Sequence, residues 1–239
     1  MRTRIDRKTL ASIYLRGHGI EIGALQFPVK LPRSVKVRYV DRLTVSELRK
    51  HYPELDSYKL VKVDILDDGE TLATIGDASQ DFVIANHFLE HCENPIKAIM
   101  NFLRVLREGG ILFLAIPDKR YTFDNKRETT SFDHLLRDYK EGPEGSRNKH
   151  LQDWVVNVEG VKDEASVKKR VEELDEMNYS IHFHIWTPKE MFDLFNKLDE
   201  LFCLPIEILL FVKHEGDVVF IIKKHTGQNV TNLQKESLE

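Results

Sequence analysis

Polar residues follow several short apolar runs in the first ninety positions, at the places where strands of a sheet would end. The carboxyl ends of parallel strands meet at one edge of an open α/β sheet, and ligands bind in the crevice beyond that edge. Carboxylates, amides and glycines suit such a crevice, because they offer hydrogen-bonding groups or a closely approaching backbone. The sequence therefore predicts one ligand site formed by Glu21, Gly23, Asp41, Asp64 and Asn86.

Gly23 and Asp41 have a separation in sequence that suits a nucleotide. A glycine at the end of the first strand lets the backbone approach a ligand as the chain turns. A carboxylate about 20 residues later accepts hydrogen bonds from ribose hydroxyls in dinucleotide-binding folds. Asp41 follows Gly23 by eighteen residues. The G-x-G-x-x-G fingerprint is absent, which disfavours a nicotinamide-dependent oxidoreductase.

The elements that position these residues alternate between apolar strands and amphipathic helices in the first half of the chain. That alternation is typical of a parallel sheet covered by helices. The helix expected at 44–51 begins with a capping box, because Thr44 is followed three residues later by Glu47. The predicted strands are 20–22, 35–40, 60–63, 81–85 and 111–116, and the predicted helices are 9–15, 44–51 and 95–106.

A charged stretch at about 119–180 lacks a strand pattern and is predicted to be a helical insertion that forms a lid. Its helices are expected at 131–140, 147–156 and 162–177. A strand at 181–186, a helix at 188–198 and an antiparallel hairpin of 206–213 with 217–223 follow. We expect an α/β fold with a doubly wound, mostly parallel, seven-stranded sheet in one domain over 1–224, and a flexible tail over 225–239.

Five segments between Gly17 and Pro117 occur in an order and at spacings that resemble the class I S-adenosylmethionine-dependent methyltransferases with a type 11-like methyltransferase domain. They resemble, in turn, that family's first motif, ribose-binding acid, adenine-contacting segment, fourth-strand motif and the turn before its fifth strand. The segments are Gly19–Gly23, Val40–Asp41, Val63–Ile65, Asp81–His91 and Leu103–Gly110. The resemblance implies a Rossmann-like fold, S-adenosylmethionine as cofactor and in-line transfer of its sulfonium methyl group to an acceptor.

The residues that this resemblance assigns to the cofactor are Glu21, Gly23, Ala24, Asp41, Arg42, Asp64, Ile65, Asn86 and His87. One departure is that the family has further glycines after its first motif, where this chain has larger residues at 24–28. Contacts to the methionine part are therefore expected from Gly23, Ala24 and the Asn86–His87 turn. If that loop is closed, the chain is a catalytically silent, cofactor-binding scaffold or regulator, which is the second hypothesis.

Histidines are the candidates for a general base, since a hydroxyl acceptor must lose its proton during methyl transfer. His182 and His184 flank one residue in a predicted strand, so they are expected on the same face. His150 lies in the insertion and His87 follows the fourth strand. The favoured function is methyl transfer to a hydroxyl of a small-molecule or sugar-containing acceptor.

The segment His87–His91 also matches H-x-x-E-H, the signature of a class of zinc hydrolases in which both histidines share a helix face. Its position directly after a strand of a nucleotide-binding series favours a helix-turn beside the cofactor, so no metal ligands are expected. Arg120, Arg127 and Arg137 would suit an anionic acceptor, but nearby aspartates can pair with them, and that interpretation is preferred.

Composition excludes several classes of function. The chain has 35 basic and 39 acidic residues and a net charge of −4, so it has no general attraction to nucleic acid. No apolar run approaches the ~18 residues of a membrane span, and the start of the sequence lacks a signal-peptide pattern, so a cytoplasmic location is expected. Cys92 and Cys203 are expected to be buried thiols. The oligomeric state stays open, with a homodimer as one alternative.

Overall fold

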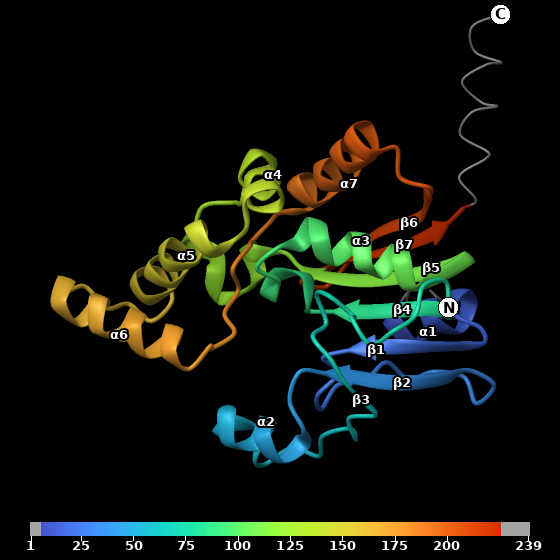
Figure 1. The fold of residues 1–239 in the computed structure, drawn as a ribbon, viewed down its shortest axis with the longest axis horizontal. Helices are drawn as coiled ribbons and strands as arrows, with labels where there is room; N and C mark the ends of the chain where they lie inside the picture. Colours follow the sequence, from blue (N-terminus) through green and yellow to red (C-terminus); the bar gives the residue numbers. More distant parts are fainter. Residues whose placement is uncertain (1–5, 226–239) are drawn as a thin grey trace, which may run out of the picture.

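The computed structural model describes residues 6–225, whose strands form one seven-stranded sheet (Figure 1). The strand order is β3-β2-β1-β4-β5-β7-β6. Strand β7 runs antiparallel to both of its neighbours, and the remaining pairs are parallel. This confirms the predicted doubly wound, mostly parallel sheet with its terminal hairpin. The strands are β1 (His18–Ile22), β2 (Lys36–Asp41), β3 (Ile65–Leu66), β4 (Gln80–Asn86), β5 (Leu106–Pro117), β6 (Ile206–His214) and β7 (Asp217–Lys224).

The order of the strands reverses beside β1. The chain passes from β1 outward to β2 and β3, and then returns to place β4 on the other side of β1. The loops that leave β1 and β4 therefore run to opposite faces of the sheet and open a crevice between them. Gly23 directly follows β1, and His87 directly follows β4.

Helices cover both faces of the sheet (Figure 1). Apolar residues of α3 (Pro95–Val105) and α7 (Pro188–Phe202) pack in one buried cluster with alternate residues of β4, β5 and β7. On the other face, α1 (Arg7–Tyr14) packs with the intervening residues of the same strands. A strand that is buried on both faces reads as a continuous apolar run, as β4 and β5 do in the sequence.

Side-chain caps explain where several of these helices begin. Thr44 and Glu47 form the predicted capping box at the start of α2 (Val45–His51). A second capping box, from Thr187 and Glu190, starts α7. The side chain of Asn94 accepts a hydrogen bond from the backbone of Lys97 and so caps α3. Each such cap satisfies a backbone N–H that has no partner inside the helix.

The insertion between β5 and α7 contains three helices and a small apolar core of its own. The helices, at the positions expected from the sequence, are α4 (Phe132–Glu141), α5 (Glu144–Asn157) and α6 (Glu164–Glu176). Leu151 and Val155 of α5 pack against Val171 and Leu174 of α6, and Ile181 completes this core. Residues 226–239 of the predicted tail lie outside the described part of the chain.

Short 3-10 turns occur at four further places, and two of them belong to the site described below. They are η1 (Pro53–Leu55), η2 (Leu89–His91), η3 (Lys119–Tyr121) and η4 (Phe123–Lys126). No helix in 6–225 has the length and apolar character needed to cross a membrane.

Two predicted strands are wrong. Residues 60–63 are not part of the sheet, because Val61 N donates to the carbonyl of Leu25 in the loop after β1. Strand β3 begins only after Asp64. Residues 181–186 are extended and buried, but only Trp186 makes a bridge, to Asp118. Burial between the insertion and the sheet gives this segment the apolar residues of a strand without strand pairing.

Candidate functional site

A cavity of about 700 Å³ lies beyond the carboxyl ends of β1, β2 and β4, at the point where the strand order reverses. This volume falls within the roughly 300–1,000 Å³ of small-molecule sites. Its floor comes from the sheet and its roof from the insertion. The lining residues are Ile22, Gly23, Leu25, Gln26, Asp41, Arg42, Leu48, Tyr52, Glu54, Leu55, Asp68, Gly69, Glu70, His87, Phe88, His91, Glu93, Phe123, Trp154, Asn178, Tyr179, Ser180, His182 and Phe183.

Gly23 and Asp41 stand side by side in the floor of this cavity. Gly23 N donates to the carbonyl of Val40 at 3.0 Å, and its φ of +61° is a conformation that side chains disfavour. Oδ1 of Asp41 accepts a hydrogen bond from Leu43 N at 3.1 Å. Burial nevertheless raises the pKa of Asp41, because desolvation outweighs that hydrogen bond. The hydrogen bond from Leu43 thus fixes the orientation of the carboxylate.

Gly69 packs tightly against its neighbours in the floor of the cavity. A Cβ built on Gly69 would lie 2.4 Å from Cζ of Phe88 and 2.5 Å from Cγ2 of Ile22. No side chain fits there without displacing the two neighbours. Gly69 therefore packs directly against Phe88 and Ile22, and it also belongs to the lining of the cavity.

The predicted cofactor residues divide into two groups. Gly23, Asp41, Arg42 and His87 line the cavity. Glu21, Ala24, Asp64, Ile65 and Asn86 do not.

Three residues of the second group have structural partners that account for their positions. The carboxylate of Glu21 accepts hydrogen bonds from Val29 N at 3.0 and 3.2 Å and so folds the loop after β1. Asp64 lies before β3 rather than after it, and its carboxylate accepts from the backbone of Tyr39. Ile65 packs against the apolar core. The two polar atoms of the Asn86 amide are buried without a hydrogen-bond partner.

Asp68, Gly69 and Glu70 line the cavity, although the sequence analysis did not single them out. They lie just after β3, beyond Asp67, so a third strand expected at 60–63 instead of 65–66 does not point to them. Backbone N–H groups of Glu93 and Asn94 donate to the Glu70 carboxylate at 2.6 and 3.1 Å. Burial raises the pKa of Glu70 to about 7 in spite of these bonds.

The loop at 24–28 borders the cavity without filling it. Leu25, with a φ of +47°, and Gln26 both line the cavity. Phe27 N donates to the carbonyl of Ala24, which makes a tight turn that carries Phe27 outward to a 73% exposed position. The larger residues that replace the expected glycines therefore leave this end of the cavity open.

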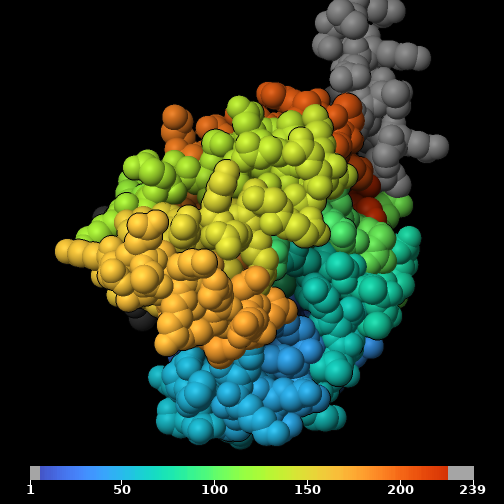
Figure 2. Space-filling model, turned by 60° about the vertical axis from the view of Figure 1, so that its left-hand side comes forward, coloured from blue at the N-terminus to red at the C-terminus, as the bar shows by residue number. Residues whose placement is uncertain are grey.

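The roof meets the floor at the end of the insertion. Arg42 donates to the carbonyl of Asn178 at 3.0 Å, and the rings of His51 and Tyr179 stack with centroids 5.8 Å apart. In Figure 2 the insertion, in yellow and orange, lies over the blue surface that contains α2. These contacts span the entrance of the cavity and join the insertion to the nucleotide-type half of the fold.

Two of the four predicted catalytic histidines reach the cavity. His87 and His182 line it, whereas His150 and His184 do not. Nε2 of His150 lies 3.0 Å from Nε2 of His134, and their rings pack beside that of His184. His182 and His184 thus point into separate clusters, so the prediction that they share one face is wrong. Without strand pairing, 181–186 does not hold a two-residue repeat of side-chain directions.

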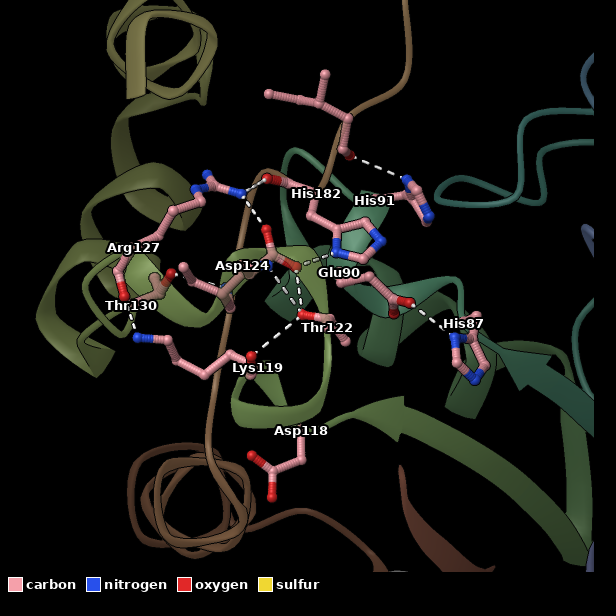
Figure 3. A network of polar contacts seen from close by, with 12 residues as sticks. His87, Glu90, His91, Asp118, Lys119, Thr122, Asp124, Arg127, Thr130 and His182 are labelled. Carbon is pink, nitrogen blue, oxygen red and sulfur yellow. Dashed lines mark hydrogen bonds and ion pairs between the residues drawn. The ribbon is translucent and has the colours of Figure 1, made fainter. Parts of the chain in front are cut away.

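The two cavity histidines have different surroundings. Nδ1 of His182 lies 2.6 Å from Oδ2 of Asp124, and Arg127 holds the other oxygen of that carboxylate at 2.8 Å (Figure 3). Burial lowers the pKa of His87, but its hydrogen bond to Asp217 and the nearby charge of Glu90 outweigh this and raise that pKa overall. His87 thus interacts with Asp217 and Glu90, while the ring of His182 is held by Asp124.

The geometry that the zinc-hydrolase hypothesis requires is absent. His87 has a φ of +48°, and η2, a 3-10 turn of three residues, follows it. His87 and His91 therefore do not lie one turn apart on an α-helix face. His87 bonds instead to Asp217, while His91 turns toward the insertion and contacts the carbonyl of Ile181.

The arginines considered for an anionic acceptor are paired elsewhere. Arg120 forms an ion pair with Asp118, and buried Arg127 pairs with Asp124 and Asp153. Arg137 contacts Nδ1 of His134. None of these three arginines lines the cavity, which agrees with the preferred interpretation from the sequence.

Comparisons with known proteins agree with this geometry. Residues 33–114 match a family model described as a methyltransferase domain, and this match runs from β2 into β5. A comparison with curated proteins found no match to this chain.

Three of the solved structures that match the chain align with most of its length. A protein from Rhodobacter sphaeroides, described as a candidate Zn-dependent alcohol dehydrogenase, is 12% identical, with 94% of this chain and 92% of that chain covered and a TM-score of 0.53. At this identity it shows a shared fold alone. A methyltransferase from Methanosarcina mazei is 19% identical, with 89% and 95% coverage and a TM-score of 0.47. One from Thermotoga maritima, described as a possible histamine N-methyltransferase, is 19% identical, with 88% and 82% coverage and a TM-score of 0.43.

The cavity fits a nucleoside cofactor by its own features. Asp41 offers a carboxylate with a hydrogen-bonded oxygen, and Gly23 and Gly69 bring backbone without a side chain into the lining. The family match covers β2 to the first part of β5 and so includes Asp41 and the residues after β3 and β4. Over residues 33–114 the chain is therefore similar to methyltransferase domains, and this matched part lies in the half of the sheet that borders the cavity.

Proposed function

We propose that this chain transfers the methyl group of S-adenosylmethionine to a hydroxyl of an uncharged small-molecule or sugar-containing acceptor held beneath the insertion. The observation that carries this proposal is the composition of the roof. Most of the side chains that the roof contributes to the lining are aromatic, Asn178 and Ser180 are small and uncharged, and none is an arginine or a lysine. Its four carbon-rich rings are Phe123, Trp154, Tyr179 and Phe183.

Asp41, Gly23 and Gly69 are proposed to hold the adenosine part of the cofactor on the floor of the cavity. The carboxylate of Asp41 would accept hydrogen bonds from the ribose hydroxyls, as the spacing from Gly23 suggests. Asp68 and Gly69 take the place first expected for Asp64 and Ile65, because they follow β3 at its carboxyl end. Glu21 and Ala24 act indirectly, by shaping the loop that leaves β1.

The methionine part is proposed to lie by the turn at Asn86 and His87. His87 lines the cavity at this turn, and the interactions with Asp217 and Glu90 that raise its pKa suit a residue placed near the carboxylate of the cofactor. Arg42 lines the opposite end of the cavity and donates to the carbonyl of Asn178, so it closes the entrance rather than gripping an acceptor.

An uncharged acceptor fits the roof because flat aromatic faces stack on sugar rings and other carbon-rich rings. Trp154 and Phe123 pack edge to face with centroids 5.2 Å apart, and Phe123 also packs against His182. Arg127 lies 5.7 Å from the Trp154 ring but is buried in its own ion pairs. An anionic acceptor would find no unpaired cation on this surface.

Methyl transfer then requires an acceptor oxygen in line with the sulfonium methyl group. As the new O–CH₃ bond forms, the S–CH₃ bond breaks and its electron pair stays on sulfur, which becomes a neutral thioether. The hydroxyl proton would pass to water beside the wall formed by His91 and His182. Positioning supplies much of the acceleration in such a reaction.

The experiment pairs a binding measurement with a transfer measurement. We expect S-adenosylhomocysteine to bind in calorimetry, and radiolabelled methyl groups to pass to neutral glycosides in preference to sugar phosphates or sugar acids. Preference for phosphorylated acceptors would contradict the uncharged class. Cofactor binding with no transfer to any acceptor in a broad panel would support the scaffold hypothesis instead.

A matched pair of variants tests the roof. Trp154→Ala removes a lining ring and is expected to raise KM for the acceptor while the affinity for S-adenosylhomocysteine stays the same. Tyr121→Ala removes an aromatic side chain that is 62% exposed and lies outside the lining, so both values should stay unchanged.

A further inference from the structure

Three potential metal ligands meet at the wall where the acceptor is proposed to lie. Glu90 and His91 belong to η2, and His182 comes from the extended segment that follows the insertion. One ligand atom of each residue lies within 4.8 Å of the ligand atoms of the other two. Figure 3 shows the two rings and the Glu90 carboxylate grouped together.

Glu90 is buried in a way that demands a partner. The residue is 1% exposed, and both of its carboxylate oxygens are buried without a hydrogen bond. Its nearest ionic neighbour is Nδ1 of His87 at 3.7 Å. A buried carboxylate without hydrogen bonds is costly unless it is paired or coordinates a metal. The backbone of Glu90 is fixed, because its carbonyl accepts from His184 N.

Both histidines use Nδ1 for a bond to oxygen. Nδ1 of His91 lies 2.9 Å from the carbonyl of Ile181, and Nδ1 of His182 lies 2.6 Å from Asp124. An oxygen acceptor at Nδ1 places the ring proton there and leaves the Nε2 lone pair available. Histidines that bind metals show this arrangement, in which a carboxylate or carbonyl orients the ring.

Asp124 is itself held firmly. Arg127 donates to one of its oxygens at 2.8 Å, and Thr122 Oγ1 lies 3.0 Å from the other. In Figure 3 Asp124 lies on the opposite side of the His182 ring from His91.

We propose that Glu90, His91 and His182 bind one divalent transition-metal cation, of which Zn²⁺ is the reference case, with Asp124 as the positioning residue for His182. Two histidines and one glutamate form a known ligand set for zinc sites that keep open coordination positions. Both histidines line the cavity, so the open positions face it. A metal site was not expected from the sequence, because His182 lies 91 residues after His91.

Metal binding at this site does not depend on the proposed function. Its role in methyl transfer rests on that function and would deepen it. An acceptor hydroxyl that binds a divalent cation becomes more acidic. Its proton then passes to water as the oxygen attacks the methyl group, and the electron pair of the broken C–S bond remains on sulfur.

The neighbouring histidine cluster does not meet the same requirements and provides a matched control. His134, His150 and His184 also come close together. Nδ1 of His134, however, faces the guanidinium of Arg137 at 2.8 Å, so it accepts a hydrogen bond and the ring proton lies on Nε2. That Nε2 then donates to Nε2 of His150 at 3.0 Å. These ring nitrogens of His134 and His150 therefore already have hydrogen-bond partners.

The test is metal binding by the purified full-length chain, prepared free of metal and titrated with Zn²⁺ in calorimetry and with Co²⁺ in visible absorption. One metal ion per chain is expected. Glu90→Gln and His182→Asn should abolish stoichiometric binding, and Asp124→Asn should weaken it by about 10–100-fold. His134→Asn should leave both the stoichiometry and the Co²⁺ spectrum unchanged. Binding of S-adenosylhomocysteine, measured in each variant, shows that the fold and the cofactor half are intact.

Each result decides between the alternatives. A wild-type chain that binds no stoichiometric metal overturns the inference, even if it methylates an acceptor. Loss of binding in His134→Asn with retention in Glu90→Gln would move the metal to the other cluster and also overturn it. If metal binds as expected while S-adenosylhomocysteine does not, the proposed function fails and the metal site stands.

Discussion

Asp124 and His182 lie 58 residues apart in the sequence, and their side chains meet at 2.6 Å in the roof of the cavity. Asp124 belongs to η4, soon after β5, and His182 belongs to the segment that returns from the insertion to the sheet. Arg127 ties the pair further, since it donates to Asp124 and to the carbonyl of His182, each at 2.8 Å. The two ends of the insertion are thus joined at the position where acceptor chemistry is proposed.

Replacement of Asp41 should weaken cofactor binding. In Asp41→Ala the ribose hydroxyls lose a charged acceptor, so the affinity for S-adenosylhomocysteine should fall by about 1–3 kcal/mol in calorimetry. Asp64→Asn is the control, because Asp64 lies outside the lining of the cavity. Equal affinities for the Asp41→Ala and wild-type proteins would show that Asp41 does not bind the cofactor.

Replacement of Gly69 should destabilise the fold and narrow the cavity. The Cβ of Gly69→Ala would come within 2.5 Å of side-chain atoms of Phe88 and Ile22. The free energy of unfolding, measured in urea, should therefore fall by about 1–3 kcal/mol. Gly76→Ala adds the same methyl group where no atom lies within 4 Å, and it should be close to neutral. A neutral Gly69→Ala would show that Phe88 moves aside freely.

The buried carboxyl of Glu21 should make stability depend on pH. Burial raises its pKa from 4.5 to about 7, against the opposing hydrogen bond from Val29 N. The folded chain then binds the proton more strongly than the unfolded chain, so the free energy of unfolding falls as pH rises from about 4.5 to about 7. Glu21→Gln cannot ionise.

The comparison of the two proteins isolates this effect, since Glu70 and other titrating groups are common to both. Relative to the wild type, Glu21→Gln should gain on the order of 3 kcal/mol between pH 4.5 and pH 7. Urea unfolding at pH 5, 6, 7 and 8 measures the difference. A constant difference across this range would mean that Glu21 titrates normally in the folded chain.

Replacement of the buried Arg127 should strongly destabilise the folded chain. Arg127 is 2% exposed and forms ion pairs with Asp124 and Asp153. Arg127→Met leaves the buried Asp124 without its cation and should cost about 3–5 kcal/mol in urea unfolding. Arg137→Met, at an exposed arginine, should change stability by less than about 0.5 kcal/mol. Similar midpoints for the two variants would contradict the structural role of Arg127.

The two cysteines should react at different rates, although the sequence analysis expected both to be buried. Cys92 is fully buried, and burial raises its pKa well above the usual value, whereas Cys203 is exposed at the end of α7. A thiol-reactive disulfide reagent should therefore modify one cysteine quickly in the folded chain and the second only on unfolding. Cys203→Ser should abolish the fast phase, and a fast phase that persists would place Cys92 at the surface.

Most elements were predictable because they depend on local patterns. The capping box at Thr44 and Glu47, the apolar runs of β4 and β5, and the hairpin of β6 and β7 are all visible in short stretches of sequence. The third strand was misplaced because 60–63 has the apolar residues of a strand, while its backbone pairs with the loop at Leu25. Because the strand was expected too early in the sequence, the contact to the cofactor was expected from Asp64 instead of Asp68.

The sequence by itself determined the sheet, the position of Gly23 and Asp41 at its edge, and the class of cofactor, since strand period and residue spacing along a single chain carry that information. Only the tertiary structure decided which histidines face the cavity. His182 meets Asp124, His91 and Glu90, while His184, two residues on, meets His134 and His150. Those groupings depend on how the insertion folds back over the sheet, and no local pattern encodes the contacts between residues so far apart.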